Sequence, residues 1–290
     1  MSNIDIRPIQ TIEHYRAIEQ LQKAIWGLED IRVTPDNILI TAHKNGGMVL
    51  GAFDTTPDAA HPSTGQPPLI GFVFGFVGLT TQGSLKYCSH QLGILPAYQN
   101  RGIGHQLKLA QRNYALERLI DHITWTFDPL ESRNAYLNIH KLGVTCNTYL
   151  PNVYGMMRDA INVGLPSDRF QVDWWLTSTR VTSLLVQTSA HERPTGTTLE
   201  QLRNDGVTEI NPLIPGDLPR PPLTCRPLYE KRVLVHIPAD FQAVKTTDNE
   251  LARVWRQHIR DIFEEAFAMG YTVIDVLRGD QTYCYLLEQA

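Results

Sequence analysis

Residues 98–106 read YQNRGIGHQ, between a stretch typical of a strand, QLGIL (91–95), and one typical of a helix, LKLAQRNYALERL (107–119). Two glycines one residue apart at a helix start let the backbone approach a ligand closely, because glycine has no Cβ. Consecutive N–H groups at a helix N-terminus form a concave set of donors that suits a phosphate. A tight turn also needs glycine for steric reasons, so the stretch alone fits either a phosphate-binding loop or a plain turn.

Two common phosphate-binding loops do not fit this stretch. A dinucleotide-binding loop requires G-x-G-x-x-G, and Leu107 stands where the third glycine would be. A P-loop requires G-K-[ST], which the sequence lacks. The pattern present is Q-x-x-G-x-G at residues 99–104, preceded by L-x-I-x-P-x-Y at residues 92–98.

The composition is that of an ordinary globular protein. Of the 290 residues 42% are apolar and 19% charged, and the net charge of −4 argues against a nucleic-acid partner held by bulk positive charge. The start, MSNIDIRPIQ, has no signal-peptide pattern, and no apolar run approaches the roughly 18 residues that cross a bilayer, so we expect a cytoplasmic protein with no membrane partner. Four widely spaced cysteines without C-x-x-C predict no metal site and no disulfide framework.

Apolar periodicity predicts the order of elements. Up to about residue 180 it gives a strand, two helices, three strands, the helix after the glycines, a strand, a helix and a strand. The helix at 128–143 has Asp128 as its expected N-cap and Gly143 at its end. We therefore predict an α/β domain over 1–185, a proline-rich linker or surface wrap over 186–228, and a small β-α-β-β extension over 229–290.

The Q-x-x-G-x-G pattern after a strand end resembles the acetyl-CoA-binding motif of the GCN5-related N-acetyltransferase (GNAT) superfamily. The predicted element order over roughly residues 1–180 is also similar to that of the superfamily, and SHQLGILPAYQNRGIG, WTFDPLESRNAYLNIHKLG and SDRFQVDWW resemble an uncharacterised branch of predicted acetyltransferases. The resemblance implies an α/β (α+β) fold with a mixed, mostly antiparallel twisted sheet, splayed at its fourth and fifth strands, and with helices on both faces. The C-terminal α/β extension lies outside the resemblance.

The resemblance also implies a cofactor and a reaction. Acetyl-CoA, or another acyl-CoA, would donate its acyl group directly to an acceptor amine, without a metal. The pyrophosphate is expected on the N–H groups of Gln99, Asn100, Arg101, Gly102, Ile103 and Gly104. The pantetheine amides are expected to pair with the strand edge formed by Leu92, Gly93 and Ile94, and the N–H of Ile94 is the expected oxyanion donor.

His90 is the candidate base, because some members of the superfamily present a catalytic His or Glu from this place on the strand. An imidazole with a pKa of about 6.5 can accept a proton at neutral pH, although a hydrogen-bonded core histidine is the alternative interpretation. The superfamily's usual acid is a tyrosine four residues before the glycine at the next helix end. That position is Ile139 in this chain, so the usual acid is missing.

Other candidate residues lie in and after the same helix. The superfamily's Asn near the helix start falls on Ser132, with Asn134 and Asn138 nearby, and we count all three as cofactor contacts. A phenol could come instead from Tyr136, Tyr149 or Tyr154, of which we select Tyr154 as the catalytic candidate. Trp125, in the strand 122–127, is interpreted as a core residue, with a place in an acceptor pocket as the alternative.

We therefore expect an acyl-CoA-dependent N-acyltransferase that acts on a small-molecule or peptide amine. The C-terminal extension would complete the acceptor site or form an oligomer interface, such as that of a homodimer. The alternative is a non-catalytic CoA-sensing or protein-binding member of the same fold, which Ile139 suggests. A nucleotide-binding protein with an atypical loop is a weaker alternative, because no magnesium-binding or ribose-binding signature is present.

Overall fold

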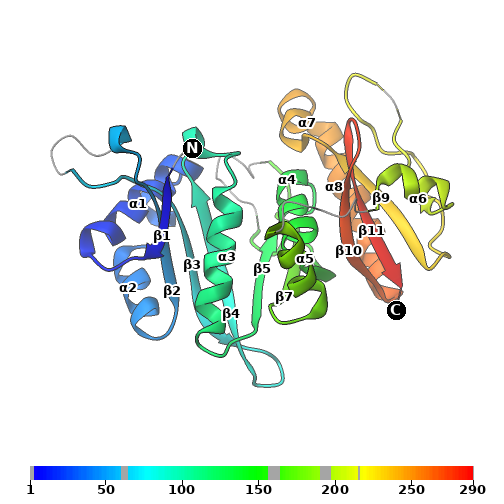
Figure 1. Cartoon of the computed structure of the whole chain (residues 1–290). Coiled ribbons are helices and arrows are strands. Elements are labelled where there is room, and N and C mark those ends of the chain that lie inside the picture. The colour runs from blue at the N-terminus through cyan, green and yellow to red at the C-terminus, as the bar shows by residue number, and fades with distance from the viewer. Residues whose placement is uncertain (1–2, 60–64, 156–163, 190–196, 215, 290) are drawn as a thin grey trace. The chain divides into compact units, whose positions relative to one another are not determined.

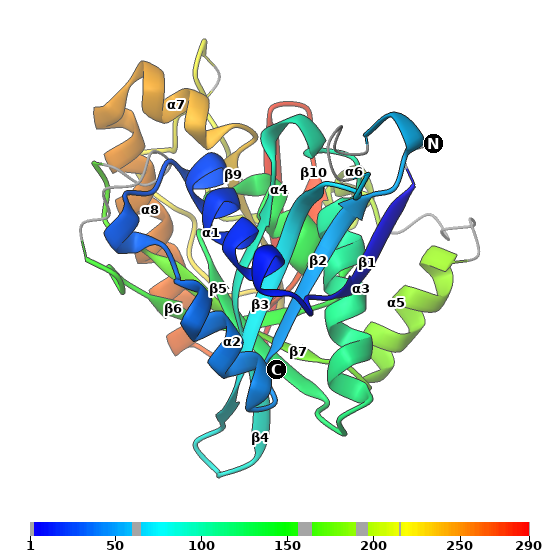
Figure 2. The same cartoon turned by 90° about the vertical axis from the view of Figure 1, so that its left-hand side faces the viewer.

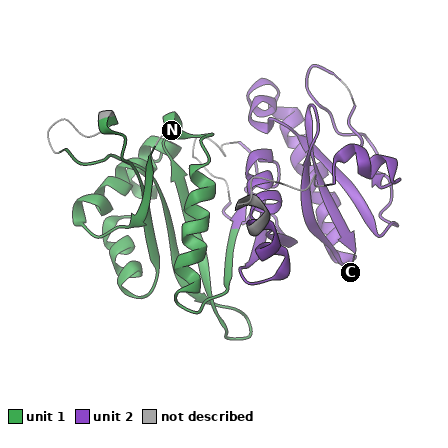
Figure 3. Ribbon diagram, in the orientation of Figure 1, with its two compact units in different colours: residues 1–125 green, residues 126–290 purple. Residues whose placement is uncertain are grey.

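The protein forms two compact units, Met1–Trp125 and Thr126–Ala290, which Figure 3 shows in two colours. The structure, a computed structural model, describes residues 3–59, 65–155, 164–189, 197–214 and 216–289. Among these residues, no helix is both long enough and apolar enough to cross a bilayer. The domain boundaries expected near residues 185 and 228 differ from this division and remain predictions.

Unit 1 is built on a mixed sheet with the strand order β1-β2-β3-β4-β5. Strands β1 to β4 are antiparallel to their neighbours, and β5 is parallel to β4. The elements are β1 (Ile4–Pro8), α1 (Ile12–Trp26), α2 (Asp36–Lys44), β2 (Met48–Asp54), β3 (Leu69–Leu79), β4 (Leu85–Ile94), α3 (Ile103–Leu116) and β5 (His122–Phe127), with 3₁₀ turns at Asp30–Arg32, Pro57–Ala59 and Pro96–Tyr98. This order is the one that the resemblance implies, so the predicted fold class is confirmed.

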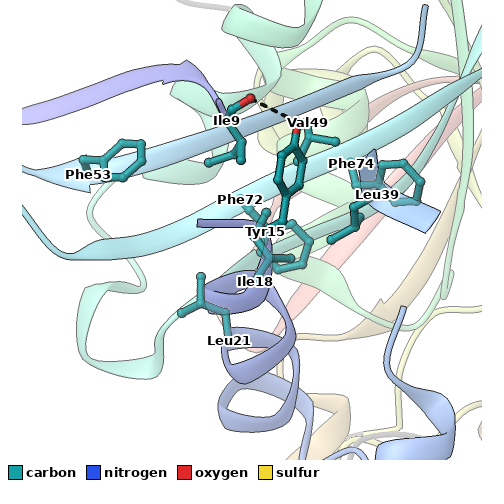
Figure 4. Packing of buried hydrophobic residues seen from close by; sticks show 9 residues of the cluster. All are labelled: Ile9, Tyr15, Ile18, Leu21, Leu39, Val49, Phe53, Phe72 and Phe74. Carbon is teal, nitrogen blue, oxygen red and sulfur yellow. Dashed lines mark hydrogen bonds between the residues drawn. The ribbon is translucent and has the colours of Figure 1, made fainter. Parts of the chain in front are cut away.

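Helices cover both faces of this sheet, as Figures 1 and 2 show. On one face Phe72 and Phe74 of β3 pack with Ile18 of α1 and Leu39 of α2, all of them buried (Figure 4). At the edge of this cluster the Tyr15 hydroxyl donates to the Ile9 carbonyl at 3.2 Å. Because strand side chains alternate, the two faces are filled independently.

Helix α3 covers the other face of the sheet, where it contacts β1 to β4. Its apolar face includes Ile103, Leu107 and Tyr114, which are buried as the periodicity predicts. The Tyr114 hydroxyl also donates to the Gly47 carbonyl at 2.9 Å, which ties the helix to the turn before β2. Helix α3 is therefore fixed to the sheet along its length, and its N-terminus lies where β4 ends.

Unit 2 contains a second set of strands in the order β7-β6-β10-β11-β9-β8. All neighbours are antiparallel except β8 and β9. The elements are α4 (Ser132–Ala135), a π-helical turn (Tyr136–Lys141), β6 (Thr145–Leu150), β7 (Arg169–Trp175), α5 (Thr179–Ser189), α6 (Leu199–Asn204), β8 (Thr208–Glu209), β9 (Arg232–Pro238), α7 (Phe241–Thr247), α8 (Asn249–Ala268), β10 (Tyr271–Arg278) and β11 (Thr282–Gln289).

The C-terminal elements share one sheet and one core with β6 and β7. Strand β10 pairs with β6, and Phe263 of α8 packs between Phe170 of β7 and Tyr285 of β11, with ring centroids 4.7 and 5.3 Å away. Part of the proline-rich stretch also packs inward, because Leu202 of α6 and Ile210 after β8 are buried. Of the linker or wrap predicted over 186–228, residues 190–196 and 215 lie outside the described residues, and α6 and β8 are ordered parts of unit 2.

Asp128 is not a helix cap, and the prediction of a helix start there is wrong. The helix begins at Ser132, whereas the Asp128 carboxylate accepts two hydrogen bonds from the Arg256 guanidinium of α8, at 2.8 and 2.5 Å. Burial alone would raise the pKa of Asp128, but Arg256 outweighs that effect and the pKa lies below its ordinary value. The predicted helix end is confirmed, since Gly143 has a φ of 75° after the π-helical turn.

Arg256→Met would remove the two hydrogen bonds to the buried Asp128 carboxylate and leave it with the weaker pairing to Arg169, whose Nη1 lies 3.7 Å away. We therefore expect the substitution to lower the free energy of unfolding by ~3 kcal/mol, measured by urea denaturation. The matched control is Arg253→Met, on the exposed side of the same helix, where the pairing with Glu250 is solvated and the change should stay within about 0.5 kcal/mol. Equal effects of the two substitutions would show that the Asp128 pair does not stabilise unit 2.

Candidate functional site

The site begins where β4 leaves β5. Among the described residues, the two strands pair at Tyr87 with Ile123 and at Cys88 with Thr124, and no further pairs join them. Strand β4 continues from Ser89 to Ile94 in register with β3 alone. One edge of β4 is therefore open from Ser89 onwards, which is the splay that the resemblance implies.

A β-bulge lies at the start of this open edge. Phe74 of β3 pairs with Gln91, but the next residue, Gly75, pairs with Ser89, so His90 is an extra residue in β4. A bulge turns a side chain out of the regular alternation of the strand. The sequence predicted the position of His90 but gave no sign of the bulge.

The backbone of the open edge presents N–H groups away from β3. The Leu95 N–H donates to the Ile70 carbonyl at 2.9 Å. Because N–H groups alternate in direction along a strand, those of Leu92 and Ile94 point to the opposite, open edge, while Gly93 faces β3. The predicted strand edge can therefore pair with an extended ligand through Leu92 and Ile94.

The loop after β4 holds a left-handed turn at the start of α3. Gly102 is the N-cap with φ 77°, and Asn100 also has a positive φ of 62°. A Cβ at Gly102 would meet no atom within 4 Å, so the backbone conformation, and not crowding, requires the glycine. The Gln99 amide anchors the loop by donating to the Ile94 carbonyl at 3.1 Å.

The start of α3 is suited to an anion. No side chain caps it, so the N–H groups of its first residues, which include Ile103 and Gly104, lack the usual side-chain acceptor. The helix dipole makes this end positive. Arg101, whose guanidinium lies 5.0 Å from the Tyr98 ring centroid, adds a full charge beside it. The open turn and its positive charge fit the pyrophosphate of coenzyme A.

His90 has an environment that suits a base better than a structural core residue. Its ring packs edge-on against Phe74, with centroids 5.8 Å apart, and tilted against Phe76 at 6.0 Å, yet the residue remains exposed. Among the described residues, no hydrogen-bond partner holds either ring nitrogen. Partial desolvation by the surrounding side chains lowers the pKa of His90 below its ordinary value, so the ring is neutral at pH 7.

The remaining predicted site residues belong to unit 2. Ser132 is buried and its hydroxyl donates to the Ala239 carbonyl at 2.6 Å, a bond inside the unit. Asn138 is buried and Asn134 is exposed. The structure thus brings together the residues of the β4–α3 loop, whereas the roles of these three residues as cofactor contacts stay predictions.

The candidate phenols differ in how firmly they are held. Tyr149 is buried and donates to the Asp168 carboxylate at 2.7 Å; burial and this neighbouring charge raise its pKa far above the ordinary range, which argues against it as an acid. Tyr136 stacks on His140 with ring centroids 4.5 Å apart. Tyr154 is 56% exposed, with its hydroxyl 2.9 Å from that of Thr126, and remains the predicted candidate.

Sequence reasoning missed a buried lysine in unit 1. Lys108 of α3 is 4% exposed, and its Nζ donates to Ser89 Oγ at 2.9 Å and to Gln111 Oε1 at 3.0 Å. The same atom lies 3.6 Å from the ring centroid of Trp125. Burial lowers the pKa of Lys108 to about 7. The one signal in the sequence is its place beside Leu107, on the apolar stripe of the helix.

Comparisons with known proteins give similarities of fold only. No protein-family model matches the chain, and no curated protein matches it. Among solved structures, the chain is similar to one of the NatC complex bound to Gag peptide and CoA, at 16% identity over 60% of this chain and 99% of the other, with a TM-score of 0.48. It is also similar to the ribosomal-protein-S18-alanine N-acetyltransferase from Escherichia coli, at 11% identity over 61% and 96%, with a TM-score of 0.44. A GNAT family acetyltransferase from Elizabethkingia anophelis with acetyl-CoA bound gives 14% identity over 60% and 98%, and a TM-score of 0.42.

The environment of His90 can be checked without any ligand. We expect its imidazole to titrate below about pH 6.5 in an NMR chemical-shift titration, because desolvation disfavours the charged ring. Phe76→Ala should move the midpoint upwards by exposing the ring to water. A midpoint at or above the ordinary value in the wild-type protein would contradict the packing described for His90.

Proposed function

We propose that this protein is an acyl-CoA-dependent N-acyltransferase whose donor is acetyl-CoA. The observation that carries the proposal is the open edge of β4, which leads from the bulge at His90 to the uncapped start of α3. This edge offers an extended ligand two outward N–H groups, at Leu92 and Ile94, followed by a positive anion site. A pantetheine arm that ends in a pyrophosphate matches that sequence of groups.

The loop and the edge of β4 would bind different parts of the donor. The N–H groups from Gln99 to Gly104 would hold the pyrophosphate, with Arg101 adding charge. The edge of β4 would pair with the amides of the pantetheine arm, as an added strand does. Ile94 is the predicted oxyanion donor; we propose more generally that the outward N–H group of β4 lying beside the bound thioester fills this role. The bound donor supplies a thioester carbonyl for attack by an amine.

His90 would take the proton from the acceptor. Its lowered pKa keeps the ring neutral and able to accept a proton at pH 7, and its exposure leaves it within reach of a second substrate. Phe76, which is 41% exposed beside it, offers an apolar surface to the acceptor. We infer that the acceptor is a small molecule or peptide that carries a primary amine next to an apolar group.

One observation favours a second candidate function, a CoA sensor without catalysis. Ile139, fully buried, occupies the position of the expected acid, and the Tyr149 phenol is held by Asp168. A protein that binds acyl-CoA but lacks an acid could respond to the ligand without turning it over. Binding and turnover therefore need separate experiments.

Binding is tested by thermal unfolding with free CoA and with acetyl-CoA. A ligand at about 100 times its dissociation constant should stabilise the protein by ~2.7 kcal/mol. Gly102→Glu places a negative side chain at the anion site, and a hundredfold weaker binding would leave only ~0.4 kcal/mol at the same concentration.

The matched control for this substitution is Gly83→Glu. Gly83 lies in the exposed turn between β3 and β4, also with a positive φ, 82°, and with no atom within 4 Å of an added Cβ. The substitution Gly83→Glu introduces the same charge and the same backbone strain away from the anion site, so this variant should keep the full stabilisation by CoA. Stabilisation by ATP or NAD but by no CoA ester would refute the proposal.

Turnover is tested by following free CoA with a thiol reagent across a panel of primary amines and amino-terminal peptides. His90→Ala should lower the rate by about 10²–10⁴-fold, the usual contribution of a positioned base. The control is His14→Ala on α1, because that ring also packs edge-on against a phenylalanine, Phe53, and has a lowered pKa. CoA binding with no release above background for any amine would favour the sensor.

A further inference from the structure

Lys108 lies at the point where β4 and β5 part. The last pair that joins the strands is Cys88 with Thr124. The next residue of each strand, Ser89 and Trp125, contacts the Lys108 Nζ: the Ser89 hydroxyl accepts from it at 2.9 Å, and the Trp125 ring centroid lies 3.6 Å away. The amino group therefore contacts both strands at the point where their pairing stops.

The amino group is surrounded by neutral groups. Among the described residues, no carboxylate pairs with Lys108, and the groups that contact it from β4, α3 and β5 are Ser89, Gln111 and Trp125, none of which titrates near pH 7. The ionisable residues one turn away along α3 are His105 and Arg112. Since no anion offsets burial, the lysine can exchange its proton near neutral pH. Such a group is a candidate acid or base wherever a substrate can reach it.

We propose that Lys108 is the proton donor to the CoA thiolate that leaves during acyl transfer, an inference that rests on the proposed function. It would supply the acid that Ile139 does not. Ser89, which contacts Lys108, is the innermost residue of the open edge of β4. An arm that is held at the anion site of α3 and follows this edge inwards from Ile94 therefore runs towards Lys108.

His90 and Lys108 lie on opposite faces of the sheet at this point. The His90 ring packs against Phe74, whose side chain belongs to the cluster under α1 and α2, whereas Lys108 approaches from α3. A proton can therefore leave the acceptor on one face while another reaches the sulfur from the other face. This separation keeps the base from competing for the proton that the acid supplies.

The proton and electron balance of the step is complete with these two residues and solvent. His90 takes a proton from the acceptor ammonium, and the freed nitrogen forms a bond to the acyl carbon. The carbon–sulfur bond breaks, its electron pair moves to sulfur, and Lys108 gives the sulfur a proton. The remaining proton on the attacking nitrogen leaves to solvent through His90, and solvent protonates Lys108 again. The net result is an amide, a thiol and one released proton.

The first test follows acyl transfer from saturating acetyl-CoA as a function of pH. An acid must be protonated to act, so the wild-type rate should fall as the pH rises through the pKa of Lys108 near 7, and Lys108→Met should lose this fall together with about 10²-fold of the rate. Lys44→Met, at the exposed end of α2, matches the charge change and should behave as wild type. The same fall of the rate with pH in wild type and in Lys108→Met would overturn the role of Lys108.

The second test needs no variant, so it still tests the role of Lys108 if Lys108→Met does not fold. The side-chain carbon resonances of labelled lysine report the pKa of Lys108 in the wild-type protein, without ligand, with desulfo-CoA, which lacks the sulfur, and with CoA sulfonate, which keeps a negative charge at the place of the sulfur near pH 7. The sulfonate should raise the pKa of Lys108 by about one unit or more relative to desulfo-CoA. Equal effects of both ligands would overturn the proposal. Failure of the wild type to bind either ligand would overturn the proposed function as well, whereas binding with equal Lys108 pKa values overturns only the role of Lys108.

Discussion

Two residue pairs hold β4 against β5, and the loss of pairing beyond them is the constraint on which the site of unit 1 depends. A strand inside a sheet has no free hydrogen-bonding groups, and an exposed edge is usually a hazard because it can pair with other chains. Here the edge is limited to Ser89–Ile94, and the bulge at His90 twists its start away from the regular sheet. The fold thereby keeps a short length of backbone available for a ligand without leaving a full strand open.

The charged groups around this edge are placed by packing. Arg101 and the first turn of α3 make one end of the edge positive, while Lys108 stands at the other end among neutral side chains. Both belong to the same helix or its cap, so the attachment of α3 to the sheet fixes their separation. Ile103 and Lys108 are five residues apart, about 7.5 Å along the helix axis, so one rigid helix sets the distance between the two ends.

The parts of this arrangement that are local in sequence could be predicted. Gly102 was predicted from the glycine pattern at a helix start, and the structure gives it a left-handed conformation there; the apolar face of α3 follows from its period. The bulge at His90 could not be found, since it depends on the register between two strands. Lys108 was missed because a helical lysine is normally solvated, and its partners come from other strands. Asp128 does accept from the Leu130 N–H at 2.9 Å, as a cap would, but only a turn follows it, and the same carboxylate also binds a guanidinium from far along the chain.

The ion pair between Asp128 and Arg256 limits the order in which the chain can fold during synthesis. Unit 1 holds all the partners of β1 to β4 within its first 125 residues, so it can close while the rest of the chain is still being made. Asp128 must wait for Arg256, 128 residues later, and β6 must wait for β10. Until then the carboxylate stays in water at no cost. During synthesis the first unit can therefore be folded while the second is still open, and the second can close only after α8 and β10 have been translated.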